Sequence, residues 1–228
     1  MDMSAPLVVD VPARVDQDGI VRLADAISAA RPGQTIVLKG GRQTFCGGLD
    51  FTYAATNGSA LVDDIDRYAR GLYALRAHPG PCIALVDGDA FGGGIALLAV
   101  CDYVVARTGV RFGLPEALYG FYPAIVFAAV SERMPAAAVR RWALQCESVD
   151  AEEALKAGLI DEVADEPERR LPRLLRRFGR ALPEAVAAIR THPAHLSAFK
   201  TALEQSAGRK QRVLDRPEVR ARLTEALG

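Results

Sequence analysis

The chain has 228 residues, half of them hydrophobic, and its 28 basic and 28 acidic side chains leave no net charge at pH 7. That size and composition predict a soluble globular protein with one domain and a small appendage. The charge balance argues against nucleic acid or an anionic membrane as a partner, because both attract strongly basic surfaces. The longest apolar runs are too short to cross a bilayer, and no N-terminal targeting pattern is visible, so we expect a cytoplasmic protein.

The N-terminal pattern predicts a β-α-β unit. Alternating apolar residues predict a strand over Leu7–Val11, helical spacing predicts a helix over Gly19–Ala30, and an aliphatic run predicts a strand over Thr35–Lys39. A glycine turn over Phe45–Asp50 follows, and an apolar stripe then predicts a helix over Ala60–Ala77.

Strands and helices continue to alternate in the next part of the chain. Strands are predicted over Cys82–Val86 and Asp102–Ala106, and a short extended piece over Arg111–Gly113. This alternation favours mostly parallel pairing with right-handed crossovers. Further helices are predicted over 124–132, 136–145, 151–157, 166–181, 183–190, 194–207 and 217–227. We therefore expect an α/β core over residues 1–163 and a helical C-terminal region over residues 164–228.

The glycines Gly92, Gly93 and Gly94 end one predicted strand and open a helix. The free N–H groups of a first helical turn favour an anion, and glycine lets a ligand atom approach them. A nucleotide P-loop would need Lys and Ser or Thr after the last glycine, where Ile95 and Ala96 stand instead. A second glycine turn at positions 47–48 could add another backbone donor, so the pattern indicates an oxyanion hole.

Four segments carry a resemblance to a known family. FCGGLD (45–50), VDGDAFGGGIALLAVCDYVVA (86–106), FGLPEALYGFYPA (112–124) and AEEALKAGLIDEV (151–163) occur in the order and near the spacing of the crotonase, or enoyl-CoA hydratase/isomerase, superfamily. Within it, GLDF (48–51) and PEALYGFYPA (115–124) resemble the hydratase-like dehydratases of polyketide biosynthesis, which act on groups held by an acyl carrier protein. The resemblance implies repeated ββα units and C-terminal helices that pack across subunits into a homotrimer or hexamer.

The resemblance also implies a site. The backbone N–H groups of Leu49 and Gly93 would hold the thioester oxygen, and Glu116 would be the catalytic acid or base. Ala96 stands where hydratases carry a second glutamate, so two-carboxylate addition of water is not supported in its usual form. Asp63 or Asp64 is a further candidate for the missing partner. The positions expected to bind substrate are Gly48, Asp50, Gly92, Tyr119, Phe121 and Tyr122.

The predicted function is an acyl-thioester enzyme that stabilises an enolate. The preferred reaction is hydration or dehydration of an acyl group carried by CoA or by an acyl carrier protein. A double-bond isomerase is the alternative that Ala96 favours, and a non-catalytic binding protein on the same fold is the third. We expect no cofactor besides the CoA- or phosphopantetheine-linked substrate, and no metal, because the three histidines have no ligand set near them. Six arginines between 169 and 180 form either a solvated face or a contact for phosphates or an acidic carrier.

Overall fold

The computed structural model describes residues 5–48 and 58–214 together with 216, 218 and 221. Its larger sheet is parallel throughout and has the order β1-β2-β4-β6-β9. The strands are β1 (Leu7–Asp10), β2 (Ile36–Lys39), β4 (Cys82–Val86), β6 (Tyr103–Arg107) and β9 (Glu162–Ala164). The predicted parallel pairing is confirmed. The predicted helix over 217–227 lies almost entirely outside the described residues.

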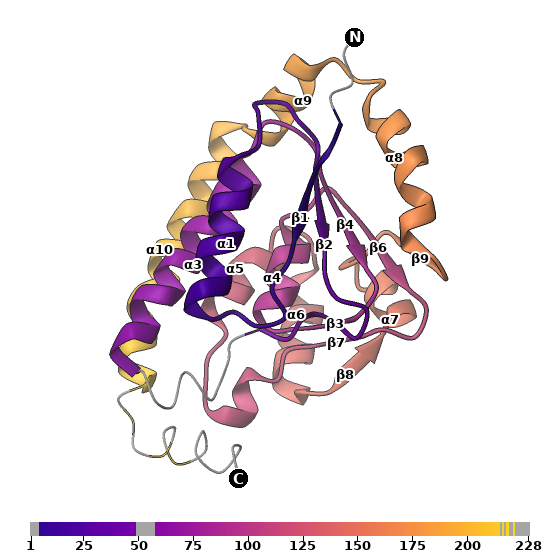
Figure 1. The fold of residues 1–228 in the computed structure, drawn as a ribbon. Helices are drawn as coiled ribbons and strands as arrows, with labels where there is room; N and C mark the ends of the chain where they lie inside the picture. Colours follow the sequence, from indigo (N-terminus) through magenta and orange to yellow (C-terminus); the bar gives the residue numbers. More distant parts are fainter. Residues whose placement is uncertain (1–4, 49–57, 215, 217, 219–220, 222–228) are drawn as a thin grey trace.

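A second, four-stranded sheet lies at one end of the larger one (Figure 1). It has the order β3-β5-β7-β8, with β8 antiparallel to β7 and the other pairs parallel. Its strands are β3 (Thr44–Cys46), β5 (Asp89–Phe91), β7 (Arg111–Gly113) and β8 (Ser148–Asp150). Three strand pairs, β2-β3, β4-β5 and β6-β7, each contribute one strand to each sheet. The ββα repeat expected from the resemblance is therefore present.

The N-terminal and central helices cover one face of the larger sheet. They are α1 (Gln17–Ser28), α3 (Gly58–Ala77), α4 (Gly93–Ala99) and α5 (Ala124–Val130). This face presents Ile36, Leu38, Ala84 and Val104, which are all fully buried in the main apolar core. Helix α1 begins at Asp16, whose carboxylate accepts a hydrogen bond of 2.6 Å from Gly19 N–H, as an N-cap residue does.

The opposite face of the larger sheet is covered by the 3-10 helix η2 (Pro167–Arg170) and helix α8 (Leu171–Phe178). The other helices beyond α5 are α6 (Ala136–Gln145), α7 (Ala151–Lys156), α9 (Pro183–Arg190) and α10 (Pro193–Leu214). Leu174 of α8 is fully buried against Val37, Ile83 and Val105, whose side chains alternate with those of the main core. The apolar stripe of Leu171, Leu174, Leu175 and Phe178 packs against this face, where Leu174 is fully buried and the other three side chains are partly buried.

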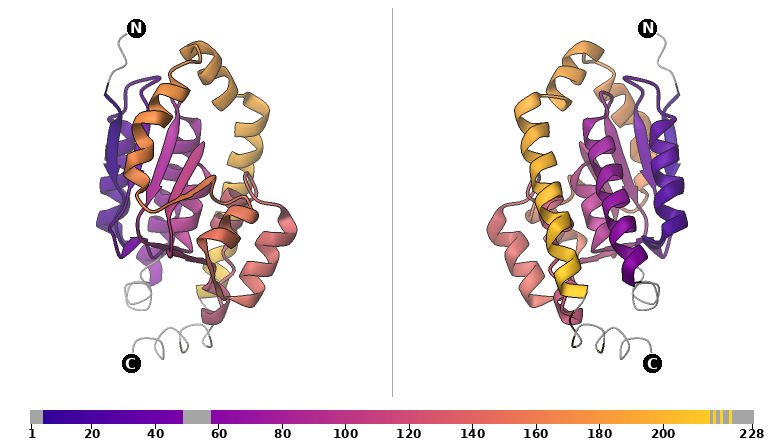
Figure 2. Two further views of the ribbon diagram at one scale, coloured as in Figure 1. Left: turned by 90° about the vertical axis from the view of Figure 1, so that its right-hand side faces the viewer. Right: turned by 90° about the vertical axis from the view of Figure 1, so that its left-hand side faces the viewer.

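Helix α10 returns along α3 and α5 (Figure 2). Phe199 and Leu203 bury their side chains in the main core, and Ser206 Oγ donates a hydrogen bond of 3.0 Å to the carbonyl oxygen of Ala124. The boundary between residues 163 and 164, and the trimer or hexamer, stay predictions. None of the described helices is long and apolar enough to span a membrane.

Candidate active site

The two glycine turns meet at the ends of neighbouring strands. Since β3 and β5 are parallel partners, their carboxyl ends lie at the same edge of the small sheet. Gly48 has a φ of 78°, and a Cβ there would lie 2.8 Å from Phe91 O and 3.1 Å from Gly93 N. Only glycine combines that φ with so close an approach. The first glycine turn is held by a hydrogen bond of 2.7 Å from Val15 N–H to Gly48 O.

Gly92 and Gly94, the outer glycines of the second turn, are each held by a different contact. Gly92 N–H donates to Gly113 O at 3.0 Å, and its φ is 50°. A Cβ on Gly94 would overlap the carbonyl oxygen of Cys46, so α4 packs directly against the end of β3. Gly93 lies between them, and its N–H has no acceptor among the described residues. A backbone donor is therefore available beside Gly48.

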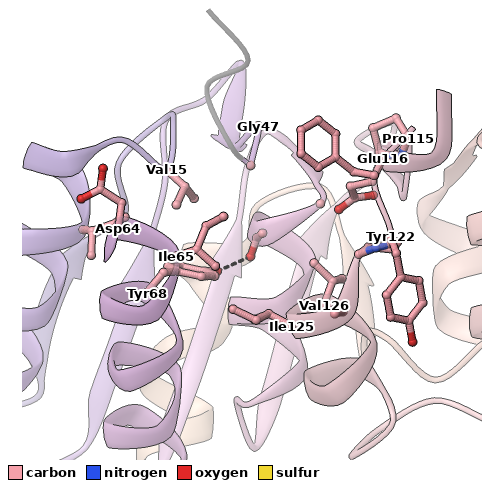
Figure 3. A pocket seen from close by; sticks show the side chains of 17 residues that line it. Val15, Gly47, Asp64, Ile65, Tyr68, Pro115, Glu116, Tyr122, Ile125 and Val126 are labelled. Carbon is pink, nitrogen blue, oxygen red and sulfur yellow. Dashed lines mark hydrogen bonds between the residues drawn. The ribbon is translucent and has the colours of Figure 1, made fainter. Parts of the chain in front are cut away.

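A pocket of about 110 Å³ opens at this junction, between α3 and α5 (Figure 3). Its wall is mostly apolar. The lining side chains outside the glycine turns are Val15, Ile20, Asp64, Ile65, Tyr68, Pro115, Glu116, Phe121, Tyr122, Pro123, Ala124, Ile125 and Val126. Such a cavity excludes water and strengthens the electrostatic interactions of the few polar groups inside it.

Glu116 begins a 3-10 helix, η1 (Glu116–Tyr119), which ends at Gly120 in the left-handed conformation. Its Oε1 faces Gly92, since a Cβ on that glycine would lie 2.7 Å from it. Its Oε2 is fully buried and has no hydrogen-bond partner in the described part of the chain. Burial raises the pKa of Glu116 to about 7, and a hydrogen bond from its own backbone opposes this only in part. A carboxyl group with this pKa can accept and return a proton near neutral pH.

The pocket brings together predicted site residues from three separate segments. The lining includes Gly48, Gly92, Gly93, Glu116, Phe121 and Tyr122. Tyr119 lies in η1, near Glu116 in sequence, but is not among the described residues that line the pocket. Leu49 and Asp50 lie outside the described residues, so the second predicted oxyanion donor stays a prediction.

The candidates for a second polar group lie on α3. Asp64 is 3% exposed, lines the pocket and pairs with Arg67 at 3.2 Å, whereas Asp63 is exposed. Tyr68 also lines the pocket, and its hydroxyl donates a hydrogen bond to Gly93 O. Tyr68 belongs to the apolar stripe that predicts the helix over Ala60–Ala77, and no role in the site was predicted for it. A tyrosine in such a stripe needs a partner for its hydroxyl, and that signal could have identified it.

The described residues contain no group of three or more His, Cys, Asp or Glu side chains close enough to bind a metal ion.

Comparison with known proteins assigns the family. The model of the family described as Enoyl-CoA hydratase/isomerase matches residues 17–222. This chain belongs to that family. A crotonyl-CoA hydratase of Syntrophomonas wolfei is 26% identical over 185 residues, covering 77% of this chain and 70% of the relative. A peroxisomal bifunctional enzyme of Danio rerio is 35% identical over 137 residues, but the match covers 58% of this chain and only 18% of that protein.

Solved structures of the enoyl-CoA hydratase/isomerase family have the same fold. An enoyl-CoA hydratase from Mycobacterium avium superimposes with a TM-score of 0.82 at 28% sequence identity, and the match covers 93% of this chain and 84% of the chain of that structure. A protein described as a polyketide biosynthesis enoyl-CoA hydratase from Bacillus subtilis gives a TM-score of 0.85 at 20% identity, with 98% and 94% covered. At that identity the likeness shows the fold alone, so the link to polyketide synthesis stays a prediction.

Proposed function

We propose that this chain is an acyl-thioester enzyme that holds the substrate's carbonyl oxygen at the glycine junction and moves a proton with Glu116. The observation that carries the proposal is the buried, unpartnered Oε2 of Glu116 in a pocket that also contains the Gly93 amide. A backbone donor aimed at a developing enolate oxygen lowers the barrier by an amount on the order of 3 kcal/mol in a water-poor site. In this proposal Leu49 supplies the second amide.

The preferred reaction is loss or addition of water across the α,β bond. In the dehydration direction the Glu116 carboxylate removes the α-proton, and the electron pair moves onto the thioester oxygen as an enolate. When the enolate collapses, the β-carbon–oxygen bond breaks, and Glu116 returns its proton to the departing hydroxyl. The products are a 2-enoyl thioester and water, and Glu116 is ionised again. Membership of the family supports CoA as the carrier, while a phosphopantetheine-linked substrate is the other form that we consider.

A double-bond isomerase is the second candidate, and Ala96 favours it. Ala96 is fully buried in α4 and offers no carboxylate. Asp64, the other acidic residue in the described part of the pocket wall, is paired with Arg67. Moving a β,γ double bond into conjugation needs only one group, which takes the α-proton and returns it at the γ-carbon.

Two substrates separate these reactions. Purified protein is incubated with a 3-hydroxyacyl-CoA and, separately, with a 3-enoyl-CoA, and the conjugated 2-enoyl product is followed by its ultraviolet absorbance. We expect the hydroxyacyl substrate to be converted. Conversion of the 3-enoyl substrate alone would establish the isomerase instead, and no reaction with either would contradict an acyl-thioester enzyme.

The pH dependence of turnover follows from the single carboxylate. Because Glu116 begins and ends the proposed cycle ionised, kcat/KM should rise with pH through about 7 and then level off. At pH 6 it should be about tenfold below the plateau, since one pH unit below the pKa leaves roughly a tenth of the group ionised. Initial rates between pH 5.5 and 9 test this. A profile that is flat across this range would mean that Glu116 does not carry the proton.

The same burial predicts a pH-dependent stability. The pKa of Glu116 is raised from 4.5 to about 7 in the folded state. Its favourable contribution to the free energy of unfolding is therefore fully present below about pH 4.5 and is lost as the pH rises through 7. Glu116→Gln removes the buried charge. We expect it to raise the free energy of unfolding at pH 8.5 by at most about 3 kcal/mol and to have little effect at pH 4. Denaturant unfolding at both pH values checks this, and an equal shift at each would contradict it.

A further inference from the structure

The hydroxyl of Tyr68 reaches the middle glycine of the second turn. Tyr68 is 6% exposed, and its hydroxyl donates a hydrogen bond to Gly93 O, drawn as a dashed line in Figure 3. A Cβ on Gly93 would lie 3.4 Å from this hydroxyl and 3.2 Å from Val15 Cγ2. Tyr68 comes from α3, and Gly93 begins α4. The bond therefore joins two elements that both contribute to the pocket wall.

The hydrogen bond from Tyr68 adds to the contacts that hold the second glycine turn. Three consecutive glycines have wide freedom in φ and ψ, because none carries a Cβ. Gly92 is held by its bond to Gly113, and Gly94 by its close packing against Cys46. The peptide group that carries the Gly93 N–H is held through Gly92 O, which accepts from Ile95 N–H at 3.0 Å and from Ala96 N–H at 3.3 Å. The hydrogen bond from Tyr68 holds the next peptide group at Gly93 O, so the two sets of bonds together limit the directions in which the Gly93 N–H can point.

The chemistry of Tyr68 suits a fixed donor better than a proton carrier. Burial raises the pKa of Tyr68 well above 10, and the nearby Cys46 and Glu116 raise it further. The phenol therefore remains protonated at every pH at which the enzyme would work. Its proton is already directed at Gly93 O, and it keeps that bond whether Glu116 is ionised or not.

We propose that Tyr68 is a positioning residue, which aims the Gly93 N–H at the thioester carbonyl oxygen through its hydrogen bond to Gly93 O. This inference rests on the proposed function, since it assumes that Gly93 N–H binds that oxygen. Misalignment of one donor weakens the stabilisation of the enolate more than the binding of the neutral substrate, because charge on the oxygen develops only during the reaction.

The test compares Tyr68→Phe with Tyr73→Phe. Tyr73 lies on the same helix, packs partly buried against the core and is not among the pocket-lining residues. We expect Tyr68→Phe to lower kcat about tenfold, the equivalent of one misdirected hydrogen bond, with KM changed less than about twofold. Tyr73→Phe should match the wild type. The rise of kcat/KM through about pH 7 should occur at the same pH in both variants, because Glu116 is unchanged.

Infrared spectroscopy of the bound thioester carbonyl distinguishes a positioning role of Tyr68 from a purely structural one. A bound 2-enoyl-CoA labelled with ¹³C at the thioester carbonyl should show its stretching band at lower frequency in the wild type than in solution, and part of that shift should be lost in Tyr68→Phe. The shifted band arises only from bound ligand, so it reports only on folded molecules. If Tyr68→Phe kept both the carbonyl band and the kcat of the wild type, the inference would be overturned. A shift in the pH dependence of kcat/KM in this variant would also overturn it, because it would indicate proton transfer by Tyr68. An unshifted band in the wild type itself would overturn the carbonyl-binding role of Gly93, and the proposed function with it.

Discussion

Glu116→Gln is expected to lower kcat by a factor of about 10³ in the dehydration assay, with KM changed by less than about threefold. The glutamine side chain has the same shape, so it should occupy the same place beside Gly92. Its amide cannot accept the α-proton, and no other carboxylate in the described pocket wall is free of an ion pair. Steady-state rates of formation of the conjugated product measure the loss.

Glu153→Gln is the matched control for this variant. Glu153 is an exposed residue of helix α7 and pairs with Arg141 at 3.7 Å, so its substitution should leave the rate unchanged. If Glu116→Gln kept the wild-type rate, Glu116 would not be the catalytic group. If the wild type itself bound acyl-CoA and the variant bound it equally well, with no turnover in either, the non-catalytic binding protein would be the better interpretation.

The long elements could be predicted from the sequence because each carries its own signal. The helices over 136–145 and 183–190 have the predicted bounds, since a proline stands at or just before each start and the apolar spacing is regular. The strands β3, β5, β8 and β9 were missed. Each has three residues, too few to show an alternating pattern, and each is defined by a partner that is distant in sequence.

The site was predictable as a set of residues, but its energetics were not. The glycine motifs and the Pro115-Glu116 pair are visible in the sequence, and the structure places Gly48, Gly93 and Glu116 around one pocket. The burial of Glu116, which sets its pKa, exists only in the folded chain, where the same pocket is also lined by Ile125 and Val126 from a different element. The hydrogen bond from Tyr68 to Gly93 likewise exists only because α3 packs beside α4.

Arg190→Ala is expected to lower the free energy of unfolding by about 3–5 kcal/mol. Arg190 is 4% exposed; it forms an ion pair with Asp102, and its Nε donates to His78 O at 2.7 Å. Another of its nitrogens donates to Leu75 O at 2.9 Å. The side chain thus joins α9 to the end of α3 and the start of β6. Its removal leaves several buried acceptors without a donor.

The Arg190 variant also tests whether residues 164–228 act as a region of their own. Arg141→Ala is its control, because Arg141 is exposed and its pair with Glu153 should contribute less than about 1 kcal/mol. If the ion pair of Arg190 couples the C-terminal helices to the core, denaturant unfolding should remain one cooperative transition that moves to lower denaturant in Arg190→Ala. A loss below about 1 kcal/mol would mean that Arg190 does not couple the two regions. Two separate transitions in the wild type would mean that the helices beyond residue 163 unfold independently of the α/β core.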